Sequence, residues 1–245
     1  MHLALCTLLF ALACRTAPSP EVAALDWPAA EKCVYTLAID SSPAGVYSVA
    51  VRSLDTLGHA ALEIAALTVL QTPAGLVSDS AVVLARRDRL APLRSRRTVS
   101  APSGTARASV TWAGGRAAML VEKPEETLRV SLRVDRRTFD NDQLTTLLRV
   151  LEVPPDTTIA LQALSGMATI AIPVRVQSLP DERAVVPAGD FLCRRVRMTV
   201  LGRDIDLWYE PAGTRRMVRY LDPSARLVME LLPGPRADTA VSQGS

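Results

Sequence analysis

The sequence contains few lysines and few aromatic residues. Lys32 and Lys123 are the only lysines among its 28 basic residues, so the other 26 are arginines, and Phe, Trp and Tyr together make up 4% of the chain. No segment alternates aromatic residues with arginines, as a surface that stacks nucleic-acid bases does. The formal net charge is only +3, and the arginine excess, together with abundant alanine, indicates the codon usage of a GC-rich genome. We therefore expect no nucleic-acid partner.

Histidine and the usual catalytic motifs are also scarce. Beyond His2 the one histidine is His59, in the turn-like segment Leu57-Gly58-His59-Ala60, where a solvated turn histidine is the simplest interpretation. Any Ser-His, Cys-His or multi-histidine metal site would depend on this residue. The sequence has no G-x-S-x-G, S-x-x-K, H-E-x-x-H, G-x-x-x-x-G-K-[ST] or paired C-x-x-C motif.

Carboxylates are the remaining candidates for catalysis, because Asp and Glu total 25. We interpret Glu122, Glu125 and Glu126 as a solvated hairpin tip, and Asp204 and Asp206 as the outer face of a strand. We expect a protein that is not an enzyme and has no cofactor and no metal. The alternative, hydrolysis by a carboxylate pair, would require two carboxylates that approach each other in a concave site.

The N-terminus has the pattern of an export signal. Residues 3–13 are apolar except for Thr7, and this run is too short to span a bilayer of ~30 Å as a helix. It ends in Ala11-Leu12-Ala13-Cys14, which resembles a bacterial lipoprotein box with its first two positions in swapped order. We expect a signal peptide at 1–13, a lipid on Cys14 and a flexible tether at 14–30. Arg15 then favours the outer membrane by the same resemblance.

Simple cleavage after Ala13 is the competing interpretation of this segment, and it would give a soluble periplasmic or secreted protein. Cleavage in either form removes Cys6, and lipidation uses Cys14, so Cys33 and Cys193 remain. In an oxidising compartment these two are candidates for a disulfide, which would stabilise the fold by roughly 5 kcal/mol in the chain-entropy model. The alternative is two small buried side chains that do not meet.

The rest of the chain reads as a series of β-strands. Short runs with alternating apolar residues are separated by turn sequences such as Ser42-Pro43-Ala44-Gly45 and Gly114-Gly115. Consecutive runs pair most simply as antiparallel neighbours. We expect one β-rich domain over 31–232, followed by a disordered tail at 233–245.

One segment has helical periodicity instead. Leu144, Leu147, Leu148 and Leu151 are spaced as the apolar stripe of an amphipathic helix. Asp140 can cap its start and, with Gln143 three residues later, resembles a capping box. We expect a helix at about 141–152 that packs across a sheet face or closes one end of a barrel.

The C-terminal part resembles the bacterial family known as domain of unknown function 3108. The similar phrases are VVPAGDFLCRRV at 185–196, DLWYE at 206–210 and RMVRY at 216–220, with RLAPL at 89–93 and a closing strand near Glu230. The resemblance implies an exported bacterial protein with a curved antiparallel sheet or incomplete β-barrel and one helix, similar to lipoprotein-localisation factors. Within it Pro187, Ala188 and Gly189 would form a turn, and Phe191 would anchor the core.

An arginine-rich segment and the expected curved sheet suggest two kinds of partner. The arginines could contact anionic lipid headgroups, although an exposed strand in an arginine-rich protein explains them as well; they are Arg86, Arg87, Arg89, Arg94, Arg96 and Arg97. We expect an envelope protein that binds a lipid or another hydrophobic ligand on its concave face. The alternative is an assembly lipoprotein that binds another envelope protein through a sheet edge or the arginine-rich strand.

The anchor gives a direct test. Purified from a Gram-negative host, the mature protein should begin at Cys14 and carry a diacylglycerol and a third acyl chain, measured as intact mass. The Cys14→Ser variant should lose this added mass. An unlipidated chain in the soluble periplasmic fraction would contradict the anchor and support simple cleavage.

Overall fold

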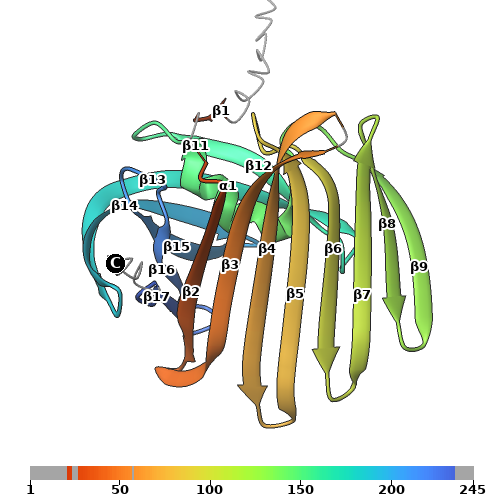
Figure 1. Ribbon diagram of the computed structural model, residues 1–245, viewed down its shortest axis with the longest axis horizontal. Helices are drawn as coiled ribbons and strands as arrows, with labels where there is room; N and C mark the ends of the chain where they lie inside the picture. Colours follow the sequence, from red (N-terminus) through yellow and green to blue (C-terminus); the bar gives the residue numbers. More distant parts are fainter. Residues whose placement is uncertain (1–20, 24–26, 57, 235–245) are drawn as a thin grey trace, which may run out of the picture.

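The computed structural model describes residues 21–23, 27–56 and 58–234. After the two-residue strand β1 (Glu21–Val22), eight long antiparallel strands form a continuous meander (Figure 1). They are β2 (Ala30–Ile39), β3 (Ser42–Thr56), β4 (His59–Thr72), β5 (Gly75–Arg86), β6 (Pro92–Ala101), β7 (Gly104–Ala113), β8 (Arg116–Lys123) and β9 (Glu126–Arg133). This meander is the one that the alternating sequence predicted.

The chain then passes through a short helical segment and a second meander. The helical segment is β10 (Thr138–Asp140), the 3-10 turn η1 (Asn141–Gln143), the helix α1 (Leu144–Val150) and β11 (Leu151–Glu152), which pairs with β1 (Glu21–Val22). The second meander is β12 (Thr158–Ser165), β13 (Ile170–Val186), β14 (Gly189–Val200), β15 (Arg203–Tyr209), β16 (Met217–Asp222) and β17 (Leu227–Leu231).

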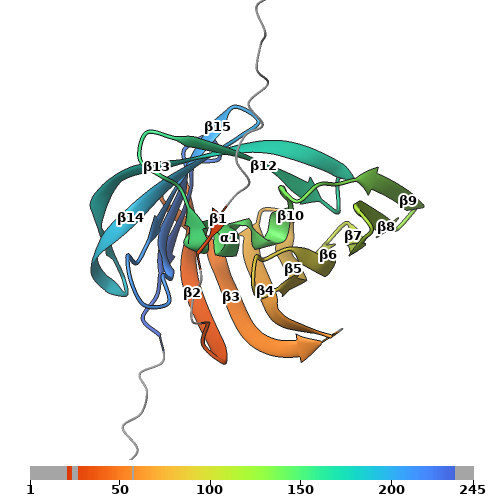
Figure 2. The same ribbon diagram turned by 90° about the horizontal axis from the view of Figure 1, so that it is seen from above.

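The two meanders join into one sheet of 15 strands, because β17 pairs antiparallel with β2. The strand order is β10-β12-β13-β14-β15-β16-β17-β2-β3-β4-β5-β6-β7-β8-β9, so β10 and β9 are its two ends. Seen from above, the sheet curls around α1 without closing (Figure 2). The expected fold, a curved antiparallel sheet or incomplete barrel with one short helix, is confirmed.

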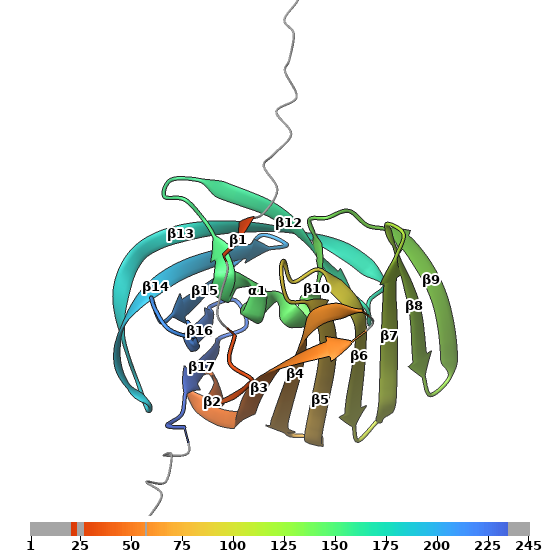
Figure 3. The same cartoon turned by 45° about the horizontal axis from the view of Figure 1, so that its top comes forward.

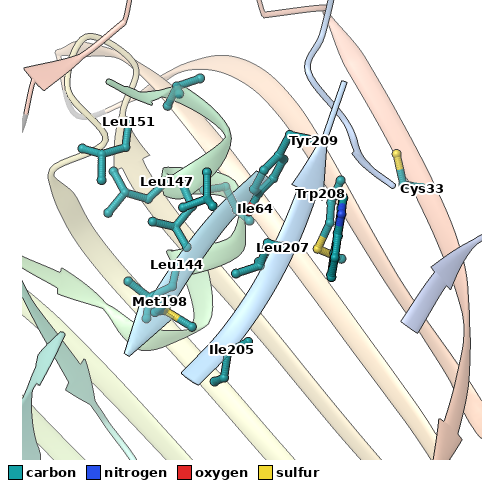
Figure 4. Close-up of a cluster of buried hydrophobic side chains, with 14 of the residues drawn as sticks. Cys33, Ile64, Leu144, Leu147, Leu151, Met198, Ile205, Leu207, Trp208 and Tyr209 are labelled. Atoms are coloured by element: carbon teal, nitrogen blue, oxygen red, sulfur yellow. The ribbon is translucent and has the colours of Figure 1, made fainter. Parts of the chain in front are cut away.

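The helical segment lies inside the curve (Figure 3). Leu144, Leu147, Leu148 and Leu151 are all buried, as their spacing predicted. They belong to the same buried cluster as Leu207 and Tyr209 of β15 (Figure 4). Among the described residues, no helix has both the length and the apolar character needed to cross a membrane.

The helix is shorter than expected, and its start is built differently. Asp140 caps the segment as predicted, because its side chain accepts a hydrogen bond from the Asp142 N–H at 3.0 Å. Gln143, however, does not complete a capping box: its amide donates to the Leu90 carbonyl at 2.7 Å. At the other end Leu151 has extended backbone (φ −70°, ψ 121°) and pairs with Val22, so tertiary pairing ends the helix before residue 152.

Strand β13 extends beyond residue 177, where the alternation in the sequence stops. It continues through Pro180 to Val186, with a register shift between Leu179 and Glu182. A bulge tolerates the proline, since Pro cannot donate to a regular ladder. The turn after it is the predicted Pro187-Ala188-Gly189 turn: Gly189 has a φ of 140°, and the Ala188 N–H donates to Leu231 at 3.0 Å.

Side chains of the sheet hold α1 in place. The guanidinium of Arg194, on β14, donates to the carbonyls of Leu148 at 2.6 Å, Leu151 at 3.0 Å and Arg149 at 3.2 Å. The Tyr209 hydroxyl donates to the Thr145 carbonyl at 2.7 Å. The last carbonyls of a helix have no partner within it, so Arg194 supplies the donors that this buried end needs.

Removal of these donors should destabilise the protein. We expect Arg194→Met to lower the free energy of unfolding by about 2–4 kcal/mol, since three buried carbonyls lose their donors. Urea denaturation measures the change. Arg183→Met, at a β13 side chain that is 74% exposed, should change it by less than about 0.5 kcal/mol. Equal effects of the two substitutions would contradict this role of Arg194.

Candidate functional site

A cavity of about 450 Å³ lies between α1 and the concave face of the sheet. Such a volume falls within the ~300–1,000 Å³ typical of small-molecule sites. Its wall comes from β2–β6 on one side and β14–β17 on the other, and η1 and the first residues of α1 cover it. The apolar and aromatic lining residues are Leu37, Ile39, Tyr47, Ala66, Leu70, Ala81, Leu144, Met198, Val200, Ile205, Tyr220, Ala225, Leu227 and Met229.

The period-2 alternation of the strands directs these side chains inward. On β2, for example, Cys33, Tyr35 and Leu37 are buried at 5%, 1% and 4% exposure. Of these three, Leu37 is nearest the C-terminal end of β2 and lines the cavity. Tyr35 lies in the core, and its hydroxyl donates to the Met217 carbonyl at 2.9 Å. The cavity is therefore the part of the sheet interior that the core does not fill.

Opposite α1, the cavity is lined by residues at the ends of several strands. Ile39 ends β2 and pairs with Leu227, and Leu227 pairs in turn with Asp222 at the end of β16. Arg203 begins β15 next to Val200, and its guanidinium lies 3.9 Å from the Asp222 carboxylate. The rim is thus mainly apolar and carries one loose ion pair.

One wall of the cavity carries a charged network centred on Arg97 of β6. Its guanidinium donates to both carboxylate oxygens of Asp79, at 2.9 and 2.5 Å, and to Asp142 of η1 at 2.9 Å. All three residues line the cavity. This network ties the helical segment to strands β5 and β6 and leaves Arg97 with a carboxylate on each side.

Asp140 lies behind this network and does not line the cavity. It is 2% exposed, and it accepts a hydrogen bond from the Ser95 hydroxyl at 2.5 Å. Burial, with a smaller contribution from the neighbouring Asp142 charge, raises the pKa of Asp140 to about 6. Burial also raises the pKa of Asp142, although Arg97 opposes this shift.

The carboxylates of the cavity wall all lie beside arginines. Asp79 and Asp142 bind Arg97, and Asp222 lies 3.9 Å from the guanidinium of Arg203. Among the described residues, no group of three or more His, Cys, Asp or Glu side chains is placed to hold a metal ion. The arrangement is suited to binding a molecule along an apolar wall.

The arginine-rich segment does not form one patch. On β6, Arg94 and Arg96 are exposed on the outer face, whereas Arg97 points to the cavity side and binds Asp79 and Asp142. Arg86 donates to both carboxylate oxygens of Asp88 at 3.1 Å, and Arg87 is half-buried. Arg89 lines a separate cavity beside Trp112. The alternation of the strand splits the set between two faces.

The two cysteines of the domain are free thiols in the structure, and both are buried. Cys33 lies on β2 and Cys193 on β14, with β15, β16 and β17 between them in the strand order. Burial raises the pKa of each thiol to about 11. Cys14, the residue expected to carry lipid, lies outside the described residues, as do the signal peptide at 1–13 and most of the tether and tail.

The other sequence expectations can be placed as well. Glu122, Glu125 and Glu126 are exposed at the β8–β9 hairpin, as expected. Asp206 does face outward from β15, but it is only 5% exposed. Burial alone would raise its pKa, and hydrogen bonds from Arg197 and Arg195 outweigh this effect, so the pKa is lowered.

Sequence reasoning missed the network of Asp79, Arg97 and Asp142. A charged residue at an inward position of an otherwise apolar strand was the available signal. Asp79 has this pattern, because Ala81, Val83 and Ala85 follow it on the same face and are buried. The partners were not readable, since they lie 18 and 45 positions apart in the chain.

The raised pKa of Asp140 predicts a pH dependence of stability. Its folded pKa lies above the ordinary 3.8, so its contribution is fully present below pH 4 and lost as pH rises through about 6. Asp140→Asn keeps the cap and removes the titration. Between pH 4 and 7.5 the free energy of unfolding of the variant should rise by about 2 kcal/mol relative to that of the wild type, measured by urea denaturation.

A control for this experiment is Asp88→Asn. The hydrogen bond from Arg86 lowers the pKa of the exposed Asp88. As pH rises from 4 to 7.5, the Asp88→Asn variant should therefore lose stability relative to wild type, if it changes at all. If the free energy of unfolding of Asp140→Asn differs from that of wild type by the same amount at pH 4 and at pH 7.5, Asp140 does not titrate as described.

Comparison with known proteins shows the fold and no family. No family model matches the sequence, and no curated protein matches it. A similar solved structure is the crystal structure of a beta-barrel-like protein of domain of unknown function DUF1849 from Brucella abortus. It is 9% identical, with 82% of this chain and 95% of that chain covered and a TM-score of 0.54. This chain therefore has a β-barrel-like fold, while its resemblance to domain of unknown function 3108 stays a prediction.

Proposed function

We propose that this chain is a non-enzymatic bacterial envelope protein, anchored by lipid on Cys14, that binds a lipid or another hydrophobic ligand in the cavity beneath α1. The observation that carries the proposal is the cavity itself. An open volume of about 450 Å³ with a mainly apolar wall excludes water from an apolar molecule and gains free energy by doing so.

The construction of the wall supports ligand binding. The lining side chains Leu37, Met198 and Ile205 are buried at 4–5% exposure, so the surrounding core already holds them in place. Hydrogen bonds from Arg194 and Tyr209 fix the helix above them. A preformed site of this kind binds without a large cost in conformational entropy.

The envelope location rests on the sequence. The apolar run at 3–13 followed by Cys14 predicts export and an anchor, and the resemblance to domain of unknown function 3108 agrees with export. The outer membrane is the expected site because Arg15 follows the cysteine. A tethered domain with an apolar cavity would meet lipids of the same envelope.

Ligand binding can be tested by filling the cavity. Ala66 lines it, while the next residue, Leu67, is 40% exposed on the other face of β4. In the full chain carrying Cys14→Ser, we expect Ala66→Trp to weaken binding of the neutral dye N-phenyl-1-naphthylamine by about tenfold or more, because the indole occupies the site. Fluorescence titration measures the affinity.

The matched control is Leu67→Trp, which adds an indole on the outer face of the same strand and should leave dye affinity unchanged. Native mass spectra of the unsubstituted protein should also show a co-purified lipid. Absence of dye binding by the unsubstituted protein, or equal binding by both variants, would overturn the proposal.

A second candidate function is binding of another envelope protein at the edge strand β9. This strand is one end of the sheet, and no other described strand pairs with its outer edge. The opposite end, β10, has only three residues and all are buried. Thus β9 is the one of the two ends that a partner can reach.

The edge of β9 is regular and exposed. Lys123 and Glu126 form the pair that closes the β8–β9 turn. From there, successive residues of β9 direct their N–H and C=O groups alternately to β8 and to the free edge. Those that face the free edge are Thr127, Arg129, Ser131 and Arg133. The strand contains no proline, and its pairing with β8 has no register shift. Such an edge can add a strand from a partner.

Site-specific photo-crosslinking in cells tests this second function. A benzoylphenylalanine in place of Thr127 on β9 should give one discrete protein adduct. The same residue in place of Val82, which is 41% exposed but lies on β5 between two paired strands, should give none. Identical patterns at both positions, or no adduct at Thr127, would exclude the edge as a docking site.

A further inference from the structure

The charges of the cavity restrict the kind of ligand that it can hold. Three aspartates line it (Asp79, Asp142 and Asp222), against two arginines, Arg97 and Arg203. No lysine or histidine is among the described lining residues. The formal charge of the lining is therefore −1, from three negative and two positive groups.

The inner guanidinium already has two carboxylate partners. Arg97 donates to Asp79 through Nε and Nη2 and to Asp142 through Nη1. The contact with Asp79 is bidentate, the strongest geometry for this pair. An anionic headgroup would have to share this guanidinium with two carboxylates of the same charge, and both would repel it.

The guanidinium at the end of the cavity away from α1 is also paired. Arg203 lies 3.9 Å from the nearest oxygen of Asp222, and the Asp222 side chain is 6% exposed whereas that of Arg203 is 50% exposed. Asp222 also accepts a hydrogen bond from the Ala225 N–H at 3.0 Å. The formal charges of this pair cancel, so the net negative charge of the lining comes from Asp79 and Asp142 around Arg97.

From these contacts we infer that the cavity binds a long-chain amphiphile whose polar group is a hydroxyl or an amine, and that it rejects fatty-acid carboxylates and phosphate headgroups. The inference rests on the proposed ligand-binding function and specifies its ligand. A hydroxyl or ammonium donates to the outward lone pairs of Asp79 or Asp142 and leaves the network of Arg97 intact. A carboxylate has no donor to offer and repels both.

Competition with three ligands of equal chain length tests the inference. The full chain carrying Cys14→Ser is loaded with N-phenyl-1-naphthylamine at pH 7.5 and titrated with dodecylamine, dodecanol and dodecanoate, each below its micelle-forming concentration. We expect the amine and the alcohol to displace the dye at concentrations at least about tenfold lower than the acid. Dodecanoate that displaces the dye as well as the other two would overturn the inference.

Substitution of Asp79 in the network should shift the preference of the cavity from dodecylamine toward dodecanoate. In Asp79→Asn the bidentate carboxylate partner of Arg97 is lost and Asp142 remains, so the Nε and Nη2 side of the guanidinium can bind an anion, and dodecanoate should gain at least about tenfold relative to dodecylamine. The control is Asp88→Asn, which removes the carboxylate of another Asp–Arg pair, at an exposed position outside the cavity. It should leave the order unchanged.

The failures of the two proposals are distinguishable. If the dye does not bind to the unsubstituted protein, the ligand-binding function itself is wrong. If the dye binds and dodecanoate competes equally or better, only the inferred ligand class is wrong. The ranking of the three ligands on the unsubstituted protein decides the inference even where Asp79→Asn does not fold.

Discussion

The hydrogen bonds from Arg194 to the end of α1 are the contacts on which the rest of the structure depends. A helix of seven residues is too short to be stable alone, and its last carbonyls lie inside the curved sheet, away from water. From β14, Arg194 donates to two of these carbonyls, those of Leu148 and Arg149, and to the carbonyl of Leu151 directly after the helix. Because the helix stays at this position, it closes one end of the sheet and leaves the space below it open as a cavity.

The curvature of the sheet depends on a second long-range contact, the pairing of β17 with β2. This pairing joins the last strand of the chain to the first long one, so two meanders become one continuous surface around the helix. Each meander alone would expose the apolar face that now forms the core. Bringing β17 next to β2 costs conformational entropy, because the loop between them is long. Burial of the apolar faces of both meanders against the same helix offsets this cost.

Charge and apolar surface act together at the cavity. The network of Asp79, Arg97 and Asp142 holds the start of the helical segment to β5 and β6, and the same three side chains form the polar part of the wall. A contact that stabilises the fold thereby also sets the electrostatic character of the site. The ligand class that we propose for the cavity follows from this double role.

The sequence by itself determined the strands, the apolar stripe of the helix, the Asp140 cap and the Pro187-Ala188-Gly189 turn, because each depends on neighbours within a few positions. It also carried the export pattern that ends at Cys14. Only the tertiary structure decided where β13 bends, where the helix ends against Val22, and that Arg97 separates from Arg94 and Arg96. These features depend on pairs far apart in the chain, such as Arg97 with Asp142, and local periodicity holds no information about which distant side chains will meet.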